Sequence, residues 1–217
     1  MAVSASKELV AATAGRRPYR SPLRRQQMAD TRLAVIDAAR ELFLAKGWTA
    51  TGMRDIAAAA GVAVETVYAR FSSKRGVLRA VADIAAAGDD APVPLSERQE
   101  FLTIGQGHRA ARIGAAARLL VAVQVRTAAI ATLLRQAAPS DEEIAEMLRS
   151  TRERQRSDVA TALELIVGRP PTVSERDGVW AIASPEVFLL LVEESGWTPD
   201  QYEGWVAGTL ERVIPRS

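Results

Sequence analysis

A short stretch of the sequence gathers side chains suited to binding a nucleic acid. Glu65 offers a carboxylate that can accept a hydrogen bond from cytosine N4, and Val64 beside it can contact a thymine methyl group. The guanidinium of Arg54 stands ten residues before Val64 and can donate hydrogen bonds to base edges. These three residues are the candidates for reading a base sequence.

Three further side chains in the same stretch can donate hydrogen bonds to phosphate oxygens, namely Thr66, Tyr68 and Lys74. Tyr68 also fits a half-buried aromatic residue, and Lys74 also fits a solvated lysine. A cation at the start of a helix is unfavourable for the helix dipole, and a phosphate partner would explain Lys74. Residue types alone leave these alternatives open.

The rest of the chain offers no catalytic or metal-binding set. The 217 residues include no cysteine and one histidine, His108, which excludes disulfides, thiolate metal sites and multi-histidine metal sites within one chain. The sequence also lacks the Gly-x-Ser-x-Gly nucleophile motif and the Walker phosphate loop. We therefore expect no enzyme, no catalytic residues, no metal and no cofactor. The absence of cysteine suits a reducing cytosol, so a cytoplasmic location is expected.

The candidate residues are positioned by a predicted helix, turn and helix. Apolar residues at helical spacing predict one helix over 53–60 and a second over 64–70. Gly61 lies between them and suits a helix C-cap, because glycine accepts a positive φ. Val67 and Phe71, four residues apart, give the second helix one apolar face. This pattern is typical of a helix-turn-helix, whose second helix enters the DNA major groove.

Further helices are predicted on both sides of this motif. A first helix over 28–46 ends at Gly47, and another begins at Lys74 with Ser73 as its N-cap. The segment 88–94 combines glycine, charge and two prolines, and it predicts a domain boundary.

Composition predicts an all-α fold, because helix formers dominate and strand-like alternation is rare. The net charge of +2 is unevenly spread. Residues 1–88 carry 14 Lys and Arg against 7 Asp and Glu, which gives +7, and residues 89–217 carry 14 against 19, which gives −5. A basic first part suits nucleic-acid binding by that part alone. The arginine-rich segment 1–27 is predicted to be disordered, either as an arm that follows DNA or as a solvated tail.

An ordered set of short motifs runs from residue 36 to residue 78. It consists of Ile36 to Phe43, Gly47, Thr51, Arg54 to Ala57, Ala60 to Val62, Thr66 to Tyr68, Phe71 to Lys74, and Leu78. At these spacings the set resembles the DNA-binding domain of TetR-family transcription regulators over residues 33–84, about a quarter of the chain.

The resemblance implies an all-helical homodimer with an N-terminal DNA-binding domain and a larger ligand-binding and dimerisation domain. Most members of the family are repressors that a small molecule releases from a DNA operator. The resemblance favours phosphate contacts for Thr66, Tyr68 and Lys74, and it places Thr51 among the DNA contacts. The expected parts are a disordered basic arm over 1–27, a helix-turn-helix domain over 28–88, and a helical ligand-binding and dimerisation domain over 89–217.

Two residues depart from the family pattern. Ala63 stands where the recognition helix usually begins with a Ser or Thr cap, and Gly52 stands where a hydroxyl residue usually starts the preceding helix. A missing cap costs about 1 kcal/mol. These departures leave room for a second hypothesis, in which the chain is a helical dimer that acts through protein partners and its helix-turn-helix no longer reads DNA.

The second domain is less informative. Capping boxes at Thr172 and Thr198 start its last helices. The resemblance makes the helices over 174–193 and 199–213 the homodimer interface, although they could simply complete a monomeric core. Residues 108–137 are strongly apolar but interrupted by arginines, so no membrane span is expected. Candidate contacts for a small-molecule effector, which could be apolar or cationic, are Gln124, Met147, Trp180 and Phe188.

Overall fold

The computed structural model describes residues 22–215, and their side chains from residue 26 onward. These residues form helices joined by turns, with no strand among them, which confirms the predicted all-α class. The elements are α1 (Pro22–Ala50), α2 (Met53–Ala59), α3 (Val64–Phe71), α4 (Lys74–Ala87), η1 (Leu95–Glu97), α5 (Gln99–Leu102), η2 (Thr103–Gly105), α6 (Arg109–Ala137), η3 (Ala138–Ser140), α7 (Glu142–Val167), α8 (Val173–Ile182), α9 (Pro185–Leu189), η4 (Leu190–Glu194) and α10 (Pro199–Val213).

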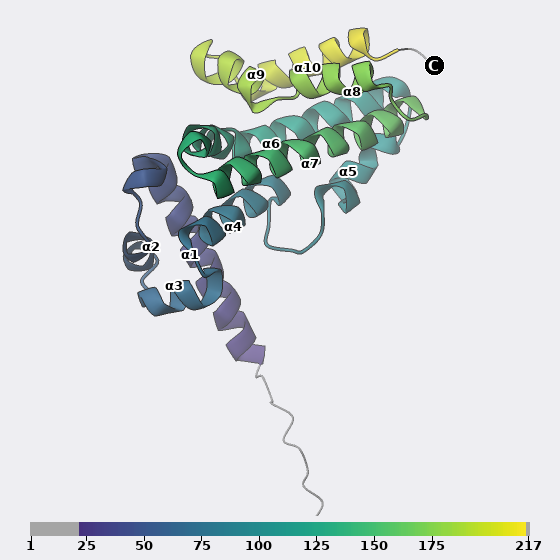
Figure 1. Ribbon diagram of the computed structural model, residues 1–217. Helices are drawn as coiled ribbons and strands as arrows, with labels where there is room; N and C mark the ends of the chain where they lie inside the picture. The colour runs from purple at the N-terminus through teal and green to yellow at the C-terminus, as the bar shows by residue number, and fades with distance from the viewer. Residues whose placement is uncertain (1–21, 216–217) are drawn as a thin grey trace, which may run out of the picture.

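Helices α1 to α4 pack together at one end of the molecule, and α5 to α10 form the other end (Figure 1). Phe43 of α1, Ile56 of α2 and Val67 of α3 have no exposed surface. Val77 and Leu78 of α4 are equally buried and belong to the same core. Burial of these apolar faces holds α2 and α3 against α1 and α4, and it leaves the opposite face of α3 in solvent.

The helix bounds follow the predicted ones closely, except at the start of α1. That helix begins at Pro22 instead of residue 28, so residues 22–27 are helical and the prediction of disorder is wrong for them. A proline at the first helical position costs nothing, because that position has no intrahelical N–H bond to lose. The remainder of the expected arm, residues 1–21, lies outside the described residues. Gly47 breaks the helix with φ 78° and ψ 176°, where the first helix was predicted to end.

Helix α6 lies at the centre of the larger part and contacts α1, α4, α7, α9 and α10 (Figure 1). By length and composition alone, the segment 109–140 is apolar enough to cross a membrane, and 44% of its most apolar window is buried inside the protein. Contacts with five neighbouring helices fit the central helix of a protein core.

The buried core of α1 to α4 extends across the domain boundary that the sequence predicts at 88–94. The chain leaves regular helix after Gly88, which caps α4 with φ 93°. The core of α1 to α4 nevertheless continues into the joined ends of α6 and α7. It takes in six side chains from those two helices: Ile130, Leu133, Leu134, Ala137, Ile144 and Met147. A second core joins α6, α7, α9 and α10 further away.

Polar contacts also hold α4 to the larger part at both of its ends. At its start, Arg75 forms an ion pair with Asp141, the N-cap of α7, at 2.9 Å. The guanidinium lowers the pKa of Asp141 below its ordinary value. At its end, Arg126 of α6 donates to the carbonyl oxygen of Ala85 at 2.9 Å. Helix α4 is therefore in direct contact with both α6 and α7.

Candidate nucleic-acid interface

The turn between α2 and α3 has the geometry predicted from Gly61. This glycine adopts φ 66°, and its N–H donates to the carbonyl oxygen of Ala58 at 3.2 Å. The N–H of Val62 donates to the carbonyl oxygen of Ala57 at 3.0 Å. These bonds end α2 and fix the direction in which α3 leaves the turn.

Helix α3 presents one apolar face to the core and one mixed face to solvent. Val67 and Phe71 are buried, as their spacing predicted. On the other side, Glu65 is exposed and Tyr68 is 51% exposed, while Val64 and Thr66 are half-buried. The structure therefore brings four of the predicted contact residues together on one surface. Arg54 of α2 is exposed as well.

The N-terminus of α3 has no side-chain cap. Ala63 occupies the N-cap position with extended backbone (φ −68°, ψ 142°) and offers no acceptor. The N–H of Thr66 bonds to the carbonyl oxygen of Ala63 at 3.0 Å. Among the described residues, the N–H groups of Val64 and Glu65 meet no acceptor. Free N–H groups at a helix start are a favourable place for an anion such as a phosphate.

At α2, the missing hydroxyl cap is partly replaced. Gly52 is the N-cap, and its N–H donates to the carboxylate of Asp55 at 2.9 Å. Asp55 also places a negative charge in the first turn, where the helix dipole favours it.

Thr51 is placed inside the protein, and the prediction that its side chain contacts DNA is corrected here. It is 1% exposed, and its hydroxyl is within hydrogen-bonding distance of the carbonyl oxygens of Gly47 (2.9 Å) and Leu42 (3.1 Å). A side chain so enclosed cannot reach a phosphate. Its contacts secure the end of α1 at the break in that helix.

Lys74 has a structural partner that the sequence did not predict. Its ammonium donates to the carbonyl oxygens of Trp48 (2.7 Å) and Thr51 (2.9 Å), and it lies over the Trp48 ring at 4.0 Å. Burial lowers the pKa of Lys74, and the charge of Asp141 partly offsets this effect. The cation at the start of α4 is thus explained by the carbonyl-rich end of α1. One N–H of the ammonium is left for another acceptor.

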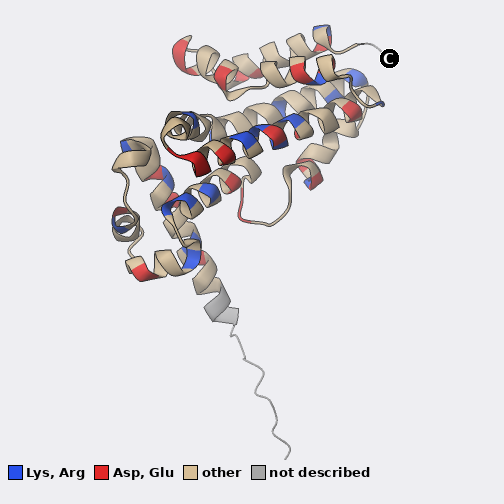
Figure 2. Ribbon diagram, in the orientation of Figure 1, with Lys and Arg blue, Asp and Glu red and all other residues tan. Residues whose placement is uncertain are grey.

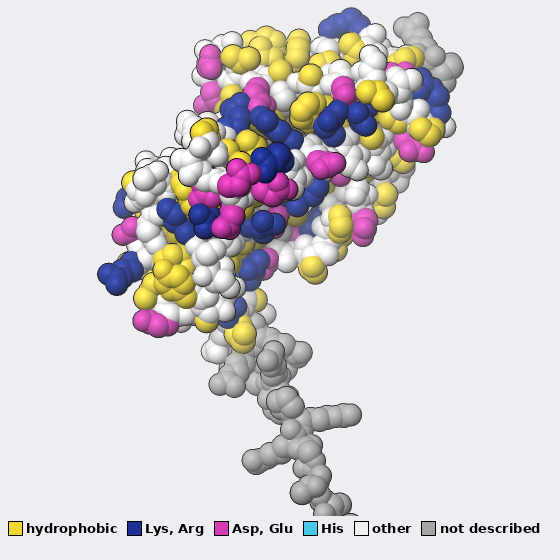
Figure 3. Space-filling model, viewed as in Figure 1, with side chains coloured by type: hydrophobic (Ala, Val, Ile, Leu, Met, Phe, Trp, Pro, Cys, Tyr) yellow, Lys and Arg dark blue, Asp and Glu magenta, His cyan; other side chains and the backbone are white. Residues whose placement is uncertain are grey.

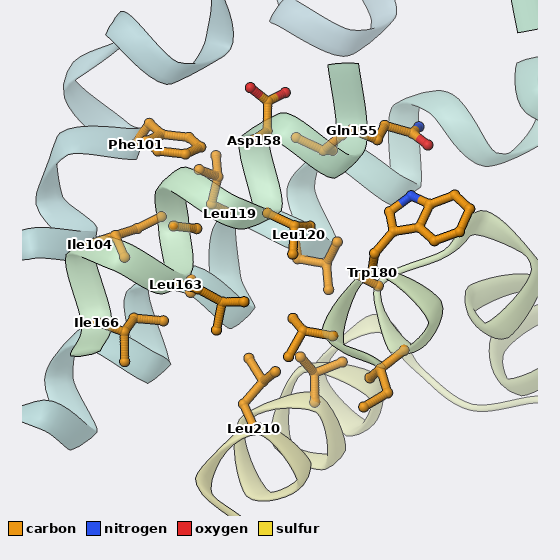
Figure 4. A pocket seen from close by; sticks show the side chains of 18 of the residues that line it. Phe101, Ile104, Leu119, Leu120, Gln155, Asp158, Leu163, Ile166, Trp180 and Leu210 are labelled. Carbon is orange, nitrogen blue, oxygen red and sulfur yellow. The ribbon is translucent and has the colours of Figure 1, made fainter. Parts of the chain in front are cut away.

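The predicted effector contacts divide into two groups. Gln124 and Trp180 line an apolar cavity of about 120 Å³ whose walls come mainly from α6, α7, α8 and α10. Trp180 and other lining residues are labelled in Figure 4. Met147 lies in the core shared with α1 to α4, and Phe188 packs edge-on against Tyr202 with ring centroids 5.2 Å apart. Neither lines the cavity, so the cavity does not support these two as effector contacts.

Sequence reasoning missed the polar residues of the cavity. Gln155 and Asp158 of α7 line it, although the run from 149 to 158 had the appearance of a solvated face. One signal was present: Gln155, Val159 and Leu163 follow each other at intervals of four. A polar residue that extends an apolar stripe in this way faces the same side of the helix as the stripe.

Fold and exposed surface together define an all-α protein with an N-terminal helix-turn-helix. Residues 35–81, which include α2, α3 and part of α4, match the family model described as bacterial regulatory proteins, tetR family. The segment over residues 35–81 is therefore of the TetR type.

Similar proteins agree with this assignment. The chain is 36% identical over 63 residues to the HTH-type transcriptional regulator AlkX of Mycobacterium tuberculosis, a match that covers 29% of this chain and 30% of AlkX. It is 42% identical over 50 residues to the HTH-type transcriptional repressor ComR of Escherichia coli, covering 23% and 24%. The matches thus span less than a third of either curated relative.

The whole fold is shared with solved structures. A TetR-family regulator from Rhodococcus sp. superposes with a TM-score of 0.66 at 17% identity, covering 86% of this chain and 99% of that one. At this identity the likeness describes the fold. The family-model match covers residues 35–81, whereas the structural likeness extends over most of the chain.

Proposed function

We propose that this protein is a homodimeric DNA-binding transcription regulator, a repressor that a small molecule releases from its operator. The outward face of α3 is the observation that carries the proposal. It presents Glu65 and Tyr68 to solvent beside an uncapped helix N-terminus, on a domain of the TetR type. A recognition helix needs such a face, because its N-terminal residues meet base edges in the major groove.

In this proposal some residues of α3 contact base edges in the major groove, and others contact the flanking phosphates. Val64 and Glu65, in the first turn, face the base edges together with Arg54 from α2. Thr66 and Tyr68 donate to flanking phosphates, and the remaining N–H of Lys74 supplements them. Two copies of α3 would enter successive turns of one DNA face, about 34–36 Å apart.

Exposed apolar surface over the last helices supports the homodimer. Leu190 and Val213 are 52% and 47% exposed, and Trp197 and Trp205 are only half-buried. Apolar side chains gather over α9 and α10 along the upper edge of Figure 3. A Cβ at Gly204 of α10 would meet no atom within 4 Å, so a partner helix has room to approach there. We therefore place the dimer interface on the helices over 174–193 and 199–213.

Release by a ligand is supported by the cavity and by its connection to α4. The cavity walls come from α6 and α7, and these helices also share a core with α1 to α4 and bind both ends of α4. A ligand that prefers one arrangement of α6 and α7 would shift the spacing of the two α3 helices. ComR, similar over its matched segment, is named a repressor. A soluble regulator of this kind would act in the cytoplasm.

The proposal is tested by binding to DNA from immediately upstream of the protein's own coding sequence. A scrambled fragment of equal length is the control, at near-physiological salt. Specific binding is expected to exceed binding to the control by about 10³ or more. Tyr68→Ala and Thr66→Ala are expected to weaken it, whereas Leu102→Ala should not, because Leu102 is exposed on α5 outside the helix-turn-helix.

The alternative is a helical dimer that acts through protein partners. It predicts equal, salt-sensitive binding to both DNA fragments and no effect of Tyr68→Ala or Thr66→Ala. That result would overturn the assignment of α3 as a reading helix.

A further inference from the structure

The cavity between α6, α7, α8 and α10 is apolar apart from a few side chains. Leucine, isoleucine, valine and alanine side chains make up most of its lining, and no lysine or arginine of residues 26–215 is part of it. In Figure 4, Leu163, Ile166 and Leu210 lie on one side of the cavity, and Asp158 and Gln155 lie on another. An engineered apolar cavity of about 150 Å³ holds one benzene molecule. A cavity of about 120 Å³ therefore suits a ring or a short alkyl chain.

The cavity adjoins a larger groove of about 930 Å³ that runs along α7. Five residues line both spaces and form the rim between them: Leu95, Val123, Gln155, Asp158 and Trp180. A ligand seated in the cavity would therefore extend past Asp158 into the groove.

The groove is rich in charge, and its charges are paired with one exception. Basic and acidic residues alternate along α7 (Figure 2). The ion pairs at the groove are Arg32 with Asp90 (3.0 Å), Arg154 with Asp83 (3.6 Å), Arg135 and Arg152 with Glu186 (2.7 and 3.3 Å), and Asp89 with Arg98 (2.7 Å). Asp158 is the exception: among the described residues, no group donates a hydrogen bond to it or forms an ion pair with it.

The environment of Asp158 is unfavourable for an isolated charge. Burial raises the pKa of its carboxyl, and Arg154 offsets this only through its more distant charge. Asp158 is half-buried, so its unpaired carboxylate loses part of its hydration, and a bound cation would offset that cost.

A second acceptor in the cavity also lacks a partner. The amide nitrogen of Gln124 donates to the carbonyl oxygen of Ala183 at 2.5 Å. A carbonyl oxygen can only accept, so this bond fixes the orientation of the amide and leaves Oε1 as the free atom. Gln124 is 3% exposed, and its Oε1 is buried with no hydrogen-bond partner among the described residues. A buried acceptor of this kind requires a donor.

We propose that the cavity binds a cationic amphiphile, with an apolar body against Leu163 and Leu210 and a protonated amine at the rim against Asp158. A hydrogen-bond donor on the ligand body would satisfy Gln124. Asp158 and the buried Oε1 of Gln124 are both acceptors, and no lysine or arginine is among the described residues that line the cavity, so a carboxylate ligand is disfavoured at these two groups. The inference rests on the proposed ligand-responsive function for its biological role, although binding itself requires no DNA.

Three molecules with one alkyl chain and different head groups test the charge preference: n-octylamine, octan-1-ol and octanoate. Calorimetric titration at pH 7, on DNA-free protein and below micelle-forming concentrations, measures each affinity. Octylamine is expected to bind about tenfold or more tightly than octanol, because a charge-assisted hydrogen bond is the stronger kind. Octanoate is expected to bind most weakly.

Asp158→Asn isolates the rim carboxylate. It is expected to lower octylamine affinity about tenfold and to leave octanol affinity unchanged, which also shows that the variant keeps its folded cavity. Asp177→Asn is the matched control, because that carboxylate pairs with Arg156 at 2.7 Å and lines neither the cavity nor the groove. It should retain the wild-type preference.

Several results would overturn the inference. They are octanol or octanoate binding as tightly as octylamine, retention of the amine preference by Asp158→Asn, and absence of binding by all three molecules. The effect of octylamine on DNA affinity is measured separately. Asp158-dependent amine binding with unchanged DNA affinity would refute release by the cavity ligand and leave the assignment of the ligand class standing.

Discussion

Substitution of Ala63 by serine is expected to stabilise the recognition helix. Ala63 already has the extended backbone of an N-cap residue, and it is exposed, so a serine meets no steric obstacle. The new hydroxyl would accept a hydrogen bond from the N–H of Glu65 or Thr66. At present, the N–H of Glu65 has no acceptor among the described residues.

The expected gain is about 1 kcal/mol, within a range of about 0.5 to 2 kcal/mol for such caps. In a protein of this size, about 1 kcal/mol raises Tm by roughly 2–4 °C if α3 unfolds with the rest of the chain. If α3 opens locally, the same gain slows amide hydrogen exchange in the segment 67–71 about fivefold. Thermal unfolding and residue-resolved exchange together distinguish these two cases.

Ala58→Ser is the matched control, because Ala58 is exposed inside α2 and a serine there caps nothing. It should be slightly destabilising, since serine has the lower helix propensity. If Ala63→Ser changes neither Tm nor exchange, or behaves like the control, the first N–H groups of α3 are not free to donate to a cap. The start of α3 would then no longer support a phosphate-binding site.

Two further substitutions test structural assignments. Lys74→Met should reduce the free energy of unfolding by about 1–3 kcal/mol, measured by urea denaturation without DNA. The substitution removes the two hydrogen bonds to the carbonyl oxygens of Trp48 and Thr51. Lys46→Met, at an exposed lysine of α1, should be neutral, and equal stability of the two variants would restore Lys74 as a DNA contact alone. Leu190→Glu should convert a dimer of 23.4 kDa chains to monomers in sedimentation equilibrium, whereas Leu102→Glu should not. A wild-type monomer at micromolar concentration would contradict the dimer itself.

Local signals in the sequence predicted the helix-turn-helix well. The bounds of α2 and α3 were each within one residue of the structure, because Gly61 and the spacing of Val67 and Phe71 act over a few residues. Caps were equally predictable. Thr172 and Thr198 form the expected capping boxes with Glu175 and Gln201, because each partner lies three residues later in the chain.

Side chains with partners far along the chain could not be predicted in this way. Lys74 bonds to carbonyl groups 26 and 23 residues earlier, and nothing near it in the sequence announces them. Burial of Thr51 depends on the break of α1 at Gly47. Likewise, the apolar character of Met147 and Phe188 could not indicate which of two cores each side chain would fill.

The core that α1 to α4 share with α6 and α7 limits how far the two parts of the chain can be exchanged. A fragment ending near residue 94 would lose Leu134, Ile144 and Met147 and would expose the apolar side chains that they cover. A chimera that joins this helix-turn-helix to another regulator's second domain must reproduce that contact surface, and a short linker graft would not do so. A functional chimera should therefore carry over the helix-turn-helix together with the ends of α6 and α7 that pack against it.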